Sequence, residues 1–212
     1  EGGQGAKIKG LFSLSANTAL KILIGQKGLG GGDNVGGGGG GASFVISGSN
    51  TPILVAGAGG GGSYHATFEP GISSRIGGNG KVELSSLTSA GTTHNASGGA
   101  GFQSNSLAAP HAGIAFSFTN GGNGATGKTN HDGGFGGGGG GSSSFPSGGG
   151  GGGYRGGDAS GLSWTQSSGQ SKGGYSFNSG TSKEDSSTLG YNAGHGRVII
   201  TQLSGDSPPP VN

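Results

Sequence analysis

One segment of the chain, Gly122–Thr129 (GNGATGKT), matches the phosphate-binding loop pattern GxxxxGK[ST] letter for letter. Proteins that use this pattern open a helix at the lysine, so that the first amides and the helix dipole hold the phosphates. Here the next residues are Asn-His-Asp-Gly-Gly-Phe and six glycines, and glycine is among the poorest helix formers. We therefore interpret the match as a chance result of the high glycine content, and we expect no nucleotide and no other cofactor.

The remaining residues that could bind metals or transfer protons are scattered along the chain. No two of the five histidines have the HxH or HxxxH spacing of a metal site, and the chain has no cysteine. The only neighbouring acids, Glu184 and Asp185, point to opposite faces of an extended chain. We expect no metal site, no catalytic residue and no enzymatic activity. The histidines, expected in turns or on the surface, are His65, His94, His111, His131 and His195.

Two short motifs, Gly134–Gly136 (GFG) and Tyr154–Gly157 (YRGG), are similar to FG and RGG segments that bind single-stranded RNA. Such binding uses repeated arginines interleaved with aromatic residues. This chain has three arginines in separate regions and a formal net charge of only +2. We expect no nucleic-acid partner, and a disordered RNA-associated tract is the least favoured of three functional interpretations.

Bulky side chains interrupt the glycine-rich stretches at a few places and are our candidate recognition residues. Aromatic side chains and arginine are the usual anchors of binding surfaces. The alternative is that half or more of them cover the ends of a bundle of glycine helices. The candidates are Tyr64, His65, Phe68, Phe145, Pro146, Tyr154, Arg155 and Trp164.

The composition limits the kind of fold that could position these residues. The 212 residues include 59 glycines, and only 9% are charged. Collagen is excluded because the glycines come in blocks and only seven prolines are present. A disulfide scaffold is excluded because there is no cysteine. We expect no membrane insertion, because no apolar run approaches the roughly 20 residues that a span needs.

Short alternating or β-branched runs predict strands separated by glycine blocks. We expect Lys7–Leu14 and Ala19–Gln26 to form a hairpin around the turn Ser15–Thr18. No stretch keeps a capped helical period over about ten residues, so we expect no long helix. The further predicted strands are Ser43–Ser47, Pro52–Ala56, Lys81–Leu84, Gly113–Thr119 and Arg197–Leu203.

The glycine blocks are unlike flexible linkers, in which glycine is mixed with serine and threonine. Glycine can adopt the extended polyproline-II geometry, which has three residues per turn and no hydrogen bonds within its own segment. Because glycine lacks Cβ, several such segments can lie side by side and donate N–H groups to neighbouring carbonyls. We favour ordered glycine helices over disordered loops. Their expected core is Gly36, Gly37, Gly38, Gly39, Gly59, Gly60, Gly136, Gly137, Gly138, Gly148, Gly149 and Gly150.

Four segments alternate glycine runs with strand–turn–strand units in a specific order. They are Leu11–Gln26, Gly36–Pro70, Gly133–Gly157 and Gly194–Thr201. In this order they resemble the glycine-rich domain in the extracellular region of the anaplastic lymphoma kinase and leukocyte tyrosine kinase receptors, which has relatives among secreted or surface proteins of bacteria and invertebrates. The receptor versions contain cysteines, which this chain lacks, and they begin with lead-in strands that would precede Glu1 here.

The resemblance implies an all-β fold: a β-sandwich related to the tumour-necrosis-factor jelly roll, with an inserted bundle of polyglycine-II helices. Residues 1–203 would form one module, and residues 204–212 a proline-containing tail or linker. The resemblance further implies an extracellular, non-catalytic scaffold for recognition or adhesion that binds a protein or glycan ligand on a surface. The alternative is a structural subunit of an extracellular filament, coat or adhesive, whose partners are copies of itself.

Overall fold

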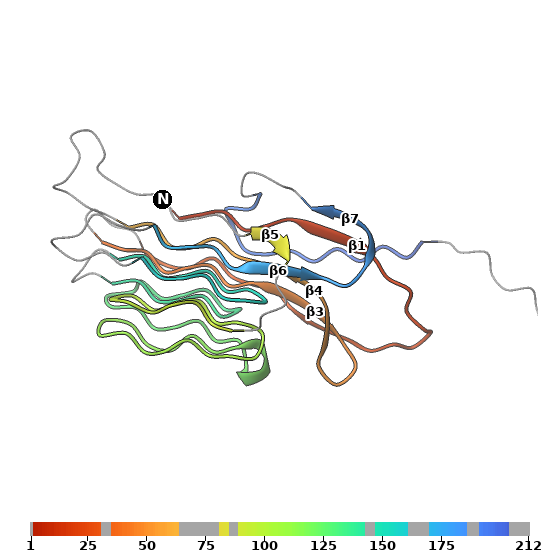
Figure 1. The fold of residues 1–212 in the computed structure, drawn as a ribbon, viewed down its shortest axis with the longest axis horizontal. Helices are drawn as coiled ribbons and strands as arrows, with labels where there is room; N and C mark the ends of the chain where they lie inside the picture. The colour runs from red at the N-terminus through yellow and green to blue at the C-terminus, as the bar shows by residue number, and fades with distance from the viewer. Residues whose placement is uncertain are drawn as a thin grey trace, which may run out of the picture.

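The computed structural model describes residues 2–30, 35–63, 81–84, 89–142, 147–160, 170–185 and 191–203. In these residues the fold is mostly β with almost no α-helix, which confirms the predicted class at this level, and the helical element among them is a 3-10 turn, η1 (Phe118–Asn120). Figure 1 shows the strands gathered in one half of the molecule. They are β1 (Ile8–Leu11), β2 (Leu20–Leu23), β3 (Ser43–Ser47), β4 (Thr51–Ala56), β5 (Lys81–Leu84), β6 (Tyr175–Asn178) and β7 (Thr181–Asp185).

The strands belong to two sheets. One has five strands in the order β2–β3–β4–β6–β5, and the other pairs β1 with β7. All neighbouring strands are antiparallel except β5 and β6, which are parallel. β1 also lies close to β4 and β6 of the larger sheet. The two sheets are therefore neighbours in space.

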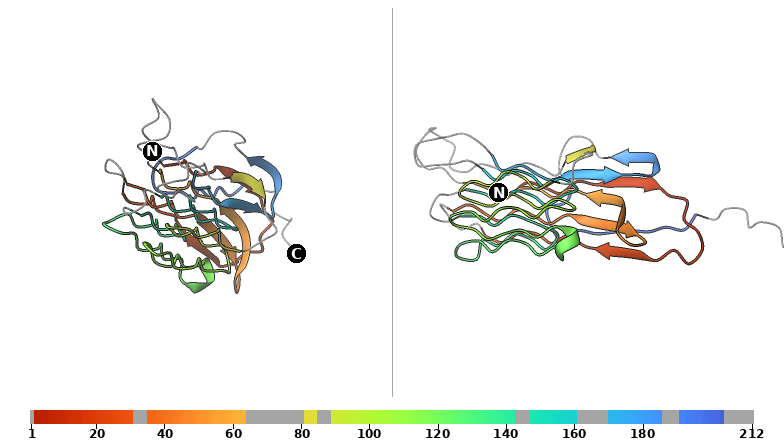
Figure 2. Two further views of the ribbon diagram at one scale, coloured as in Figure 1. Left: turned by 60° about the vertical axis from the view of Figure 1, so that its left-hand side comes forward. Right: turned by 60° about the horizontal axis from the view of Figure 1, so that its bottom comes forward.

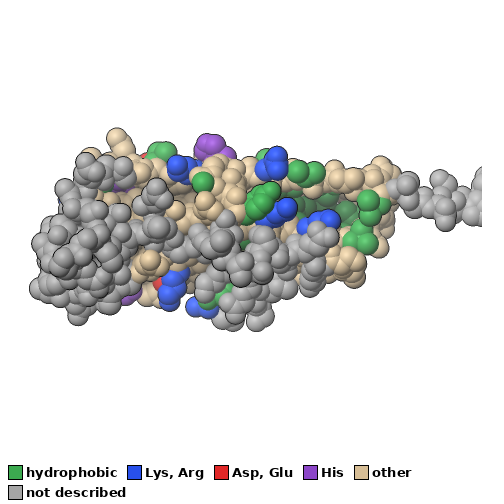
Figure 3. Space-filling model, turned by 90° about the horizontal axis from the view of Figure 1, so that it is seen from above, with side chains coloured by type: hydrophobic (Ala, Val, Ile, Leu, Met, Phe, Trp, Pro, Cys, Tyr) green, Lys and Arg blue, Asp and Glu red, His purple; other side chains and the backbone are tan. Residues whose placement is uncertain are grey.

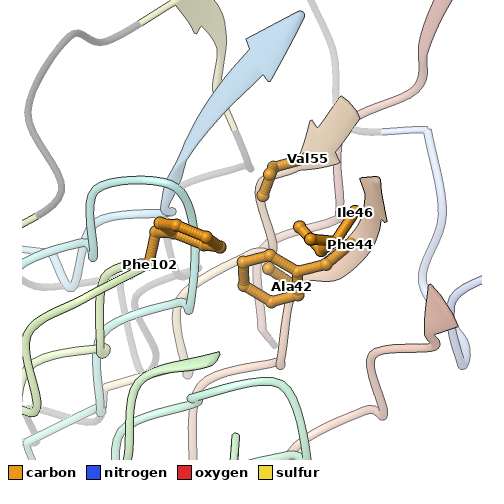
Figure 4. Packing of buried hydrophobic residues seen from close by; sticks show 5 residues of the cluster. All are labelled: Ala42, Phe44, Ile46, Val55 and Phe102. Atoms are coloured by element: carbon orange, nitrogen blue, oxygen red, sulfur yellow. The ribbon is translucent and has the colours of Figure 1, made fainter. Parts of the chain in front are cut away.

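The hydrophobic core lies on one face of β3 and β4. Successive residues of a strand point to opposite faces, and Phe44, Ile46 and Val55 share the face that is almost fully buried. They pack with Ala42 and Phe102, whose side chains converge on the same point in Figure 4. Phe102 comes from a distant, glycine-rich part of the chain, so this core joins the two halves of the molecule.

A row of aromatic rings extends this core, and we name Phe44, Phe102, Phe118, Tyr154 and Phe177 the aromatic row. The ring of Phe102 stacks on Phe118 at 5.4 Å and on Tyr154 at 5.7 Å between centroids. Tyr154 in turn stacks on Phe177 of β6 at 4.4 Å. Offset stacking at these distances adds to the free energy gained by burying the rings.

The predicted N-terminal hairpin is wrong, although strands do form within both of its segments. β1 pairs with β7 and β2 pairs with β3. The turn is present, since Thr18 N donates to Ser15 O at 3.2 Å, but the two strands enter different sheets. Alternation predicts that a segment is a strand without naming its partner, and β1 is held instead by the Asn178 side chain, which donates to Lys9 O at 2.9 Å.

The strands β6 and β7 and the tight turn between them were not predicted. The two strands are separated only by Ser179-Gly180, but they do not pair with each other: β6 lies between β4 and β5, and β7 pairs with β1. The amide of Gly180 donates to Asn178 Oδ1 at 3.0 Å and closes the turn. Both strands are short and β7 (TSKED) is polar, which explains why the hydrophobic pattern did not reveal them.

Two predicted strands, Gly113–Thr119 and Arg197–Leu203, are not strands in the structure. The amides of Gly113 and Phe116, three residues apart, donate to Thr126 and Asn123 of one neighbouring segment. A β ladder uses alternate residues for one neighbour, so this three-residue spacing excludes it. Gly113–Thr119 instead runs into η1, and residues 197–203 lie extended with mostly exposed side chains. The other predicted strands, near β3, β4 and β5, are confirmed.

The second half of the molecule is the glycine layer, defined as residues 36–42, 57–63, 97–101, 133–142 and 147–160. Its segments run side by side in all three ribbon views (Figures 1 and 2). Several continue directly into strands: residues 36–42 lead into β3, and β4 leads into residues 57–63. Sheet and glycine layer are thus built end to end from the same pieces of chain.

Backbone hydrogen bonds in the glycine layer repeat every three residues. From Gly36 to Ala42, consecutive amides donate to three different neighbouring segments in turn, and the fourth amide returns to the first neighbour. The donor and acceptor pairs are Gly36 to Ser142, Gly39 to Gly139 and Ala42 to Gly136; Gly37 to Gly62 and Gly40 to Gly59; and Gly38 to Leu29 and Gly41 to Gln26, at 2.8–3.1 Å. Every amide of this segment therefore has a backbone partner in another segment.

The same three-residue repeat governs residues 149–154, where all three neighbours run parallel to the donors. The pairs are Gly149 to Gly37 and Gly152 to Gly40; Gly150 to Ser97 and Gly153 to Ala100; and Gly151 to Lys172 and Tyr154 to Tyr175, at 2.8–3.2 Å. Ser97, Lys172 and Tyr175 are not glycines, so residues of other types also serve as acceptors in the repeat.

Most glycines of the layer have no room for a side chain. A methyl group at Gly39 would lie well under 3.0 Å from the carbonyl oxygen of Gly150, and one at Gly36 would meet the backbone of Ser147. Gly37 is different, because a methyl group there would come no closer than 3.6 Å to another atom, Gly62 N. The requirement for glycine thus depends on which way each position faces.

Buried serines complete the hydrogen bonding where no carbonyl is in reach. Ser97 Oγ accepts from Gly140 N at 2.7 Å, and Ser160 Oγ accepts from Gly148 N at 2.8 Å. Ser176 Oγ accepts from Gly57 N at 3.0 Å. All three serines are fully buried, so each hydroxyl satisfies an amide that water cannot reach.

Candidate functional site

An open groove of about 1200 Å³ runs along the molecule and is the candidate functional site. We call it the groove. On the face seen in Figure 3, hydrophobic atoms lie within a hollow that Lys and Arg side chains flank. The segments that line it are residues 2–8, 26–30, 35–45, 54–63 and 191–199. It therefore passes both the strands and the glycine layer.

The floor of the groove follows from strand alternation. Phe44 and Val55 point into the aromatic core, so their neighbours Ser43, Val45 and Leu54 point the other way and line the groove. Val45 is 6% exposed and Leu54 is half-buried. One sheet thus has two apolar faces, of which one is packed and the other meets the groove.

The C-terminal segment 191–199 forms one wall by connecting two distant parts of the chain. Gly5 N donates to Asn192 O at 2.8 Å, and Tyr191 N donates to Gly5 O at 2.9 Å. Further on, Gly196 N donates to Gly25 O at 2.7 Å. The segment is therefore fixed to the N-terminal residues at one end of the groove and to the segment after β2 at the other.

The charge of the groove has one sign. Lys27 lies beside His195, whose Nδ1 accepts from Lys27 N at 3.3 Å, and Arg197 directly follows Gly196, which contacts Gly25. Lys7 lies at the other end, over the Tyr191 ring at 4.6 Å from its centroid. No acidic side chain occurs among the described residues of the lining. The groove therefore presents a positive potential to a ligand.

An ion pair holds Asp158 of the glycine layer, away from the groove. Lys172 Nζ is 2.7 Å from Asp158 Oδ2, and Thr92 N donates to Asp158 Oδ1 at 2.8 Å. Partial burial by itself would raise the pKa of Asp158, but the hydrogen bonds from Lys172 and Thr92 outweigh it and hold this pKa below its ordinary 3.8. The same pairing raises the pKa of Lys172.

The structure places two of the sequence-predicted recognition residues, and both are half-buried. The Tyr154 ring belongs to the aromatic row, and the Arg155 guanidinium lies 5.1 Å from the centroid of the Tyr175 ring. Neither lines the groove. Their role in recognition stays a prediction, as does that of the other candidates, which lie outside the described residues: Tyr64, His65, Phe68, Phe145, Pro146 and Trp164.

The phosphate-loop pattern has no helix behind it. Thr129 and Asn130, which follow Lys128, have positive φ angles of 58° and 64°. The amides of Ala125 and Lys128 donate to Gly138 and Gly141 of the glycine layer. These amides are engaged in the fold and do not form the open cradle that phosphate binding needs.

His131 and Asp132, the one adjacent histidine–acid pair, hold this turn together. The His131 ring is bonded to Lys128 O and the residue is 6% exposed. Asp132 Oδ1 accepts from Gly127 N at 2.7 Å. Among the described residues, no three histidines or acids gather as a metal site would require.

The nucleophile pattern GxSxG occurs once, at residues 169–173, and sequence reasoning missed it. Ser171 is fully buried, and its hydroxyl donates to Gly61 O in the glycine layer. A nucleophilic serine needs an exposed hydroxyl beside a base. Ser171 therefore acts in the backbone network like the other buried serines.

Comparison with known proteins gives no family for this chain. A scan against protein-family models finds no match, and neither does a search of curated proteins. Within the described part of the chain, no helix has the length and apolar character needed to cross a membrane.

Proposed function

We propose that the protein is a non-catalytic, extracellular recognition or adhesion module whose glycine layer is a bundle of polyglycine-II helices. The observation that carries this proposal is the three-residue repeat of backbone hydrogen bonds between segments. Polyproline-II geometry has three residues per turn, so consecutive amides point about 120° apart and reach three neighbours in turn. Such a bundle is stiff because each amide is held by a neighbouring segment.

Backbone angles agree with this assignment. The glycines with positive φ among the described residues are Gly30, Gly48, Gly121, Gly122, Gly136 and Gly137. The runs 36–41, 57–62 and 148–153 contain none of them. Gly136 and Gly137 form the bend where residues 133–142 reverse direction, and the amides of both donate to Gly122 O.

The proposed role also rests on the resemblance to the receptor glycine-rich domains, which implies the jelly-roll-like sandwich and the extracellular setting. The two neighbouring sheets and the apolar face of β3 and β4 are compatible with a sandwich. A stiff, glycine-rich layer suits recognition because it holds the attached loops and the groove at fixed spacing. A protein or glycan ligand is the expected partner.

A matched pair of alanine variants tests the glycine bundle. Gly39→Ala places a methyl group against the Gly150 carbonyl and should destabilise the protein by about 1–3 kcal/mol or more. Gly37→Ala meets only ordinary contacts and should be neutral or stabilising by up to about 1 kcal/mol. Chemical denaturation measures both, and amide hydrogen exchange should show protection across residues 36–41 and 148–153 of the parent protein. Equal effects of the two variants, or rapid exchange in both runs, would contradict the proposal.

The alternative, a structural subunit of a filament, coat or adhesive, is favoured by one observation. β2 is an edge strand, paired only with β3 among the described strands, and it exposes 46% of Ile22. Such an edge can pair with a strand of another copy. Sedimentation over a range of concentrations decides between them, since a monomer throughout would exclude the subunit role.

A further inference from the structure

The groove is longer than a small-molecule pocket and is shaped for an extended chain. Its wall from Leu54 to Gly62 covers eight residue steps, which at about 3.1–3.3 Å each is roughly 25 Å. Its volume of about 1200 Å³ exceeds the usual range of small-ligand pockets, about 300–1,000 Å³. An occupant that fills it is therefore a polymer segment several residues long.

The two halves of the groove differ in chemistry. Beside the strands the lining is apolar, with Val45, Leu54 and Val198. Beside the glycine layer much of the lining is glycine backbone, at positions such as Gly37 and Gly60, together with the side chain of Leu29. The matching occupant carries apolar side chains on one face in its first part and has small residues or glycine in the other.

The charge of the groove further limits the occupant. Lys27 and Arg197 stand where the two halves meet, because their segments join at Gly25 and Gly196. Without a described acid in the lining, these cations gain most from an anionic partner. Acidic side chains that alternate with the apolar ones would face this rim while their neighbours face the floor.

We propose that the groove binds an extended acidic peptide that has a glycine-rich part and a part in which apolar and acidic residues alternate. This inference rests on the proposed recognition function and supplies its ligand class. An acidic polysaccharide fits less well, because sugars stack on aromatic rings and Tyr191, the one aromatic residue of the described lining, already carries Lys7 over its ring.

A direct binding experiment tests this with the full chain. The probe is a fluorescein-labelled peptide, Gly-Gly-Gly-Gly-Val-Glu-Val-Glu-Val, and the control is the same peptide with lysine in place of both glutamates. Fluorescence anisotropy should detect saturable binding of the acidic peptide, weaker at high salt because the charges are screened. The lysine peptide should bind at least about tenfold more weakly, because like charges repel at the rim.

Three variants assign the binding to the groove. Gly37 belongs to the groove lining, and a Cβ there would meet only ordinary contacts. We expect the branched side chain of Gly37→Val to extend into the groove and to weaken binding about tenfold or more by blocking the occupant. The double variant K27E/R197E reverses the rim charge and should have a similar effect. Lys21→Glu is the control, because Lys21 Nζ bonds Asn50 outside the groove lining. Hydrogen exchange checks that each variant keeps the glycine layer.

The outcomes separate this inference from the proposed function. Preferential binding of the acidic peptide that Gly37→Val and K27E/R197E both abolish supports the inference. Binding that is insensitive to Gly37→Val overturns it, as does a preference for alginate, an acidic polysaccharide, over the peptide. Self-association in sedimentation that Gly37→Val abolishes would assign the groove to a second copy and also overturn it. In all these cases the Gly37 and Gly39 alanine pair still tests the glycine bundle independently.

Discussion

A single buried hydroxyl contributes strongly to the free energy of unfolding in a protein whose interior is mostly backbone. Ser97→Ala would leave Gly140 N without its acceptor at a fully buried position. An unsatisfied buried amide costs about 1–3 kcal/mol, so we expect a loss of this size in chemical denaturation. Ser104→Ala, at an exposed serine five residues beyond Gly99, serves as the control and should change little. A neutral Ser97→Ala would mean that another group or water replaces the hydroxyl.

The pairing of Asp158 makes stability depend on acid pH. Its folded-state pKa is lowered, so the carboxylate stabilises the fold above the unfolded pKa of about 4, and this contribution is lost as the pH falls through the lower, folded value. Urea midpoints measured from about pH 6 to about pH 2 should fall more for the parent protein than for Asp158→Asn. Parallel curves for the two proteins would contradict this.

At the level of elements, the aromatic row connects the sheet with the glycine layer. Phe102 is 2% exposed and contacts rings from both halves. Phe102→Ala should therefore cost about 3–5 kcal/mol, whereas Phe102→Leu, which keeps most of the volume, should cost less. Thermal denaturation followed by near-ultraviolet circular dichroism measures both. If Phe102→Ala loses only the aromatic signal and keeps its stability, the row does not join the halves.

Local patterns predicted which segments are extended but not how they pair. The runs around β3 and β4 were predictable because they are apolar, bounded by glycine and joined by a Gly-Ser-Asn turn. The pairing of β1 was not predictable, because its partner β7 is a polar strand more than a hundred residues away in the sequence. At Gly113–Thr119, alternation indicated a strand, while the hydrogen bonds follow the three-residue repeat of the adjacent glycine segments.

At the scale of the whole molecule, the sequence predicts that the glycine blocks pack against one another, but it does not predict the groove. The need to pair every buried amide predicts that glycine runs lie against one another. The groove lacks such a local signature, because its lining comes from five separate segments. Lys27 and Arg197 are 170 positions apart in the sequence, and the contacts of Gly25 with Gly196 and of Lys27 with His195 bring their segments together.

Since residues 36–47 and 51–63 pass without a break from the glycine layer into strands, neither half can melt while the other keeps its shape. Loosening a strand would release the glycine-layer segment that continues it, and each such segment is hydrogen-bonded to several neighbours. We therefore expect the strands and the glycine layer to unfold together, in a single cooperative transition, under heat or mechanical force.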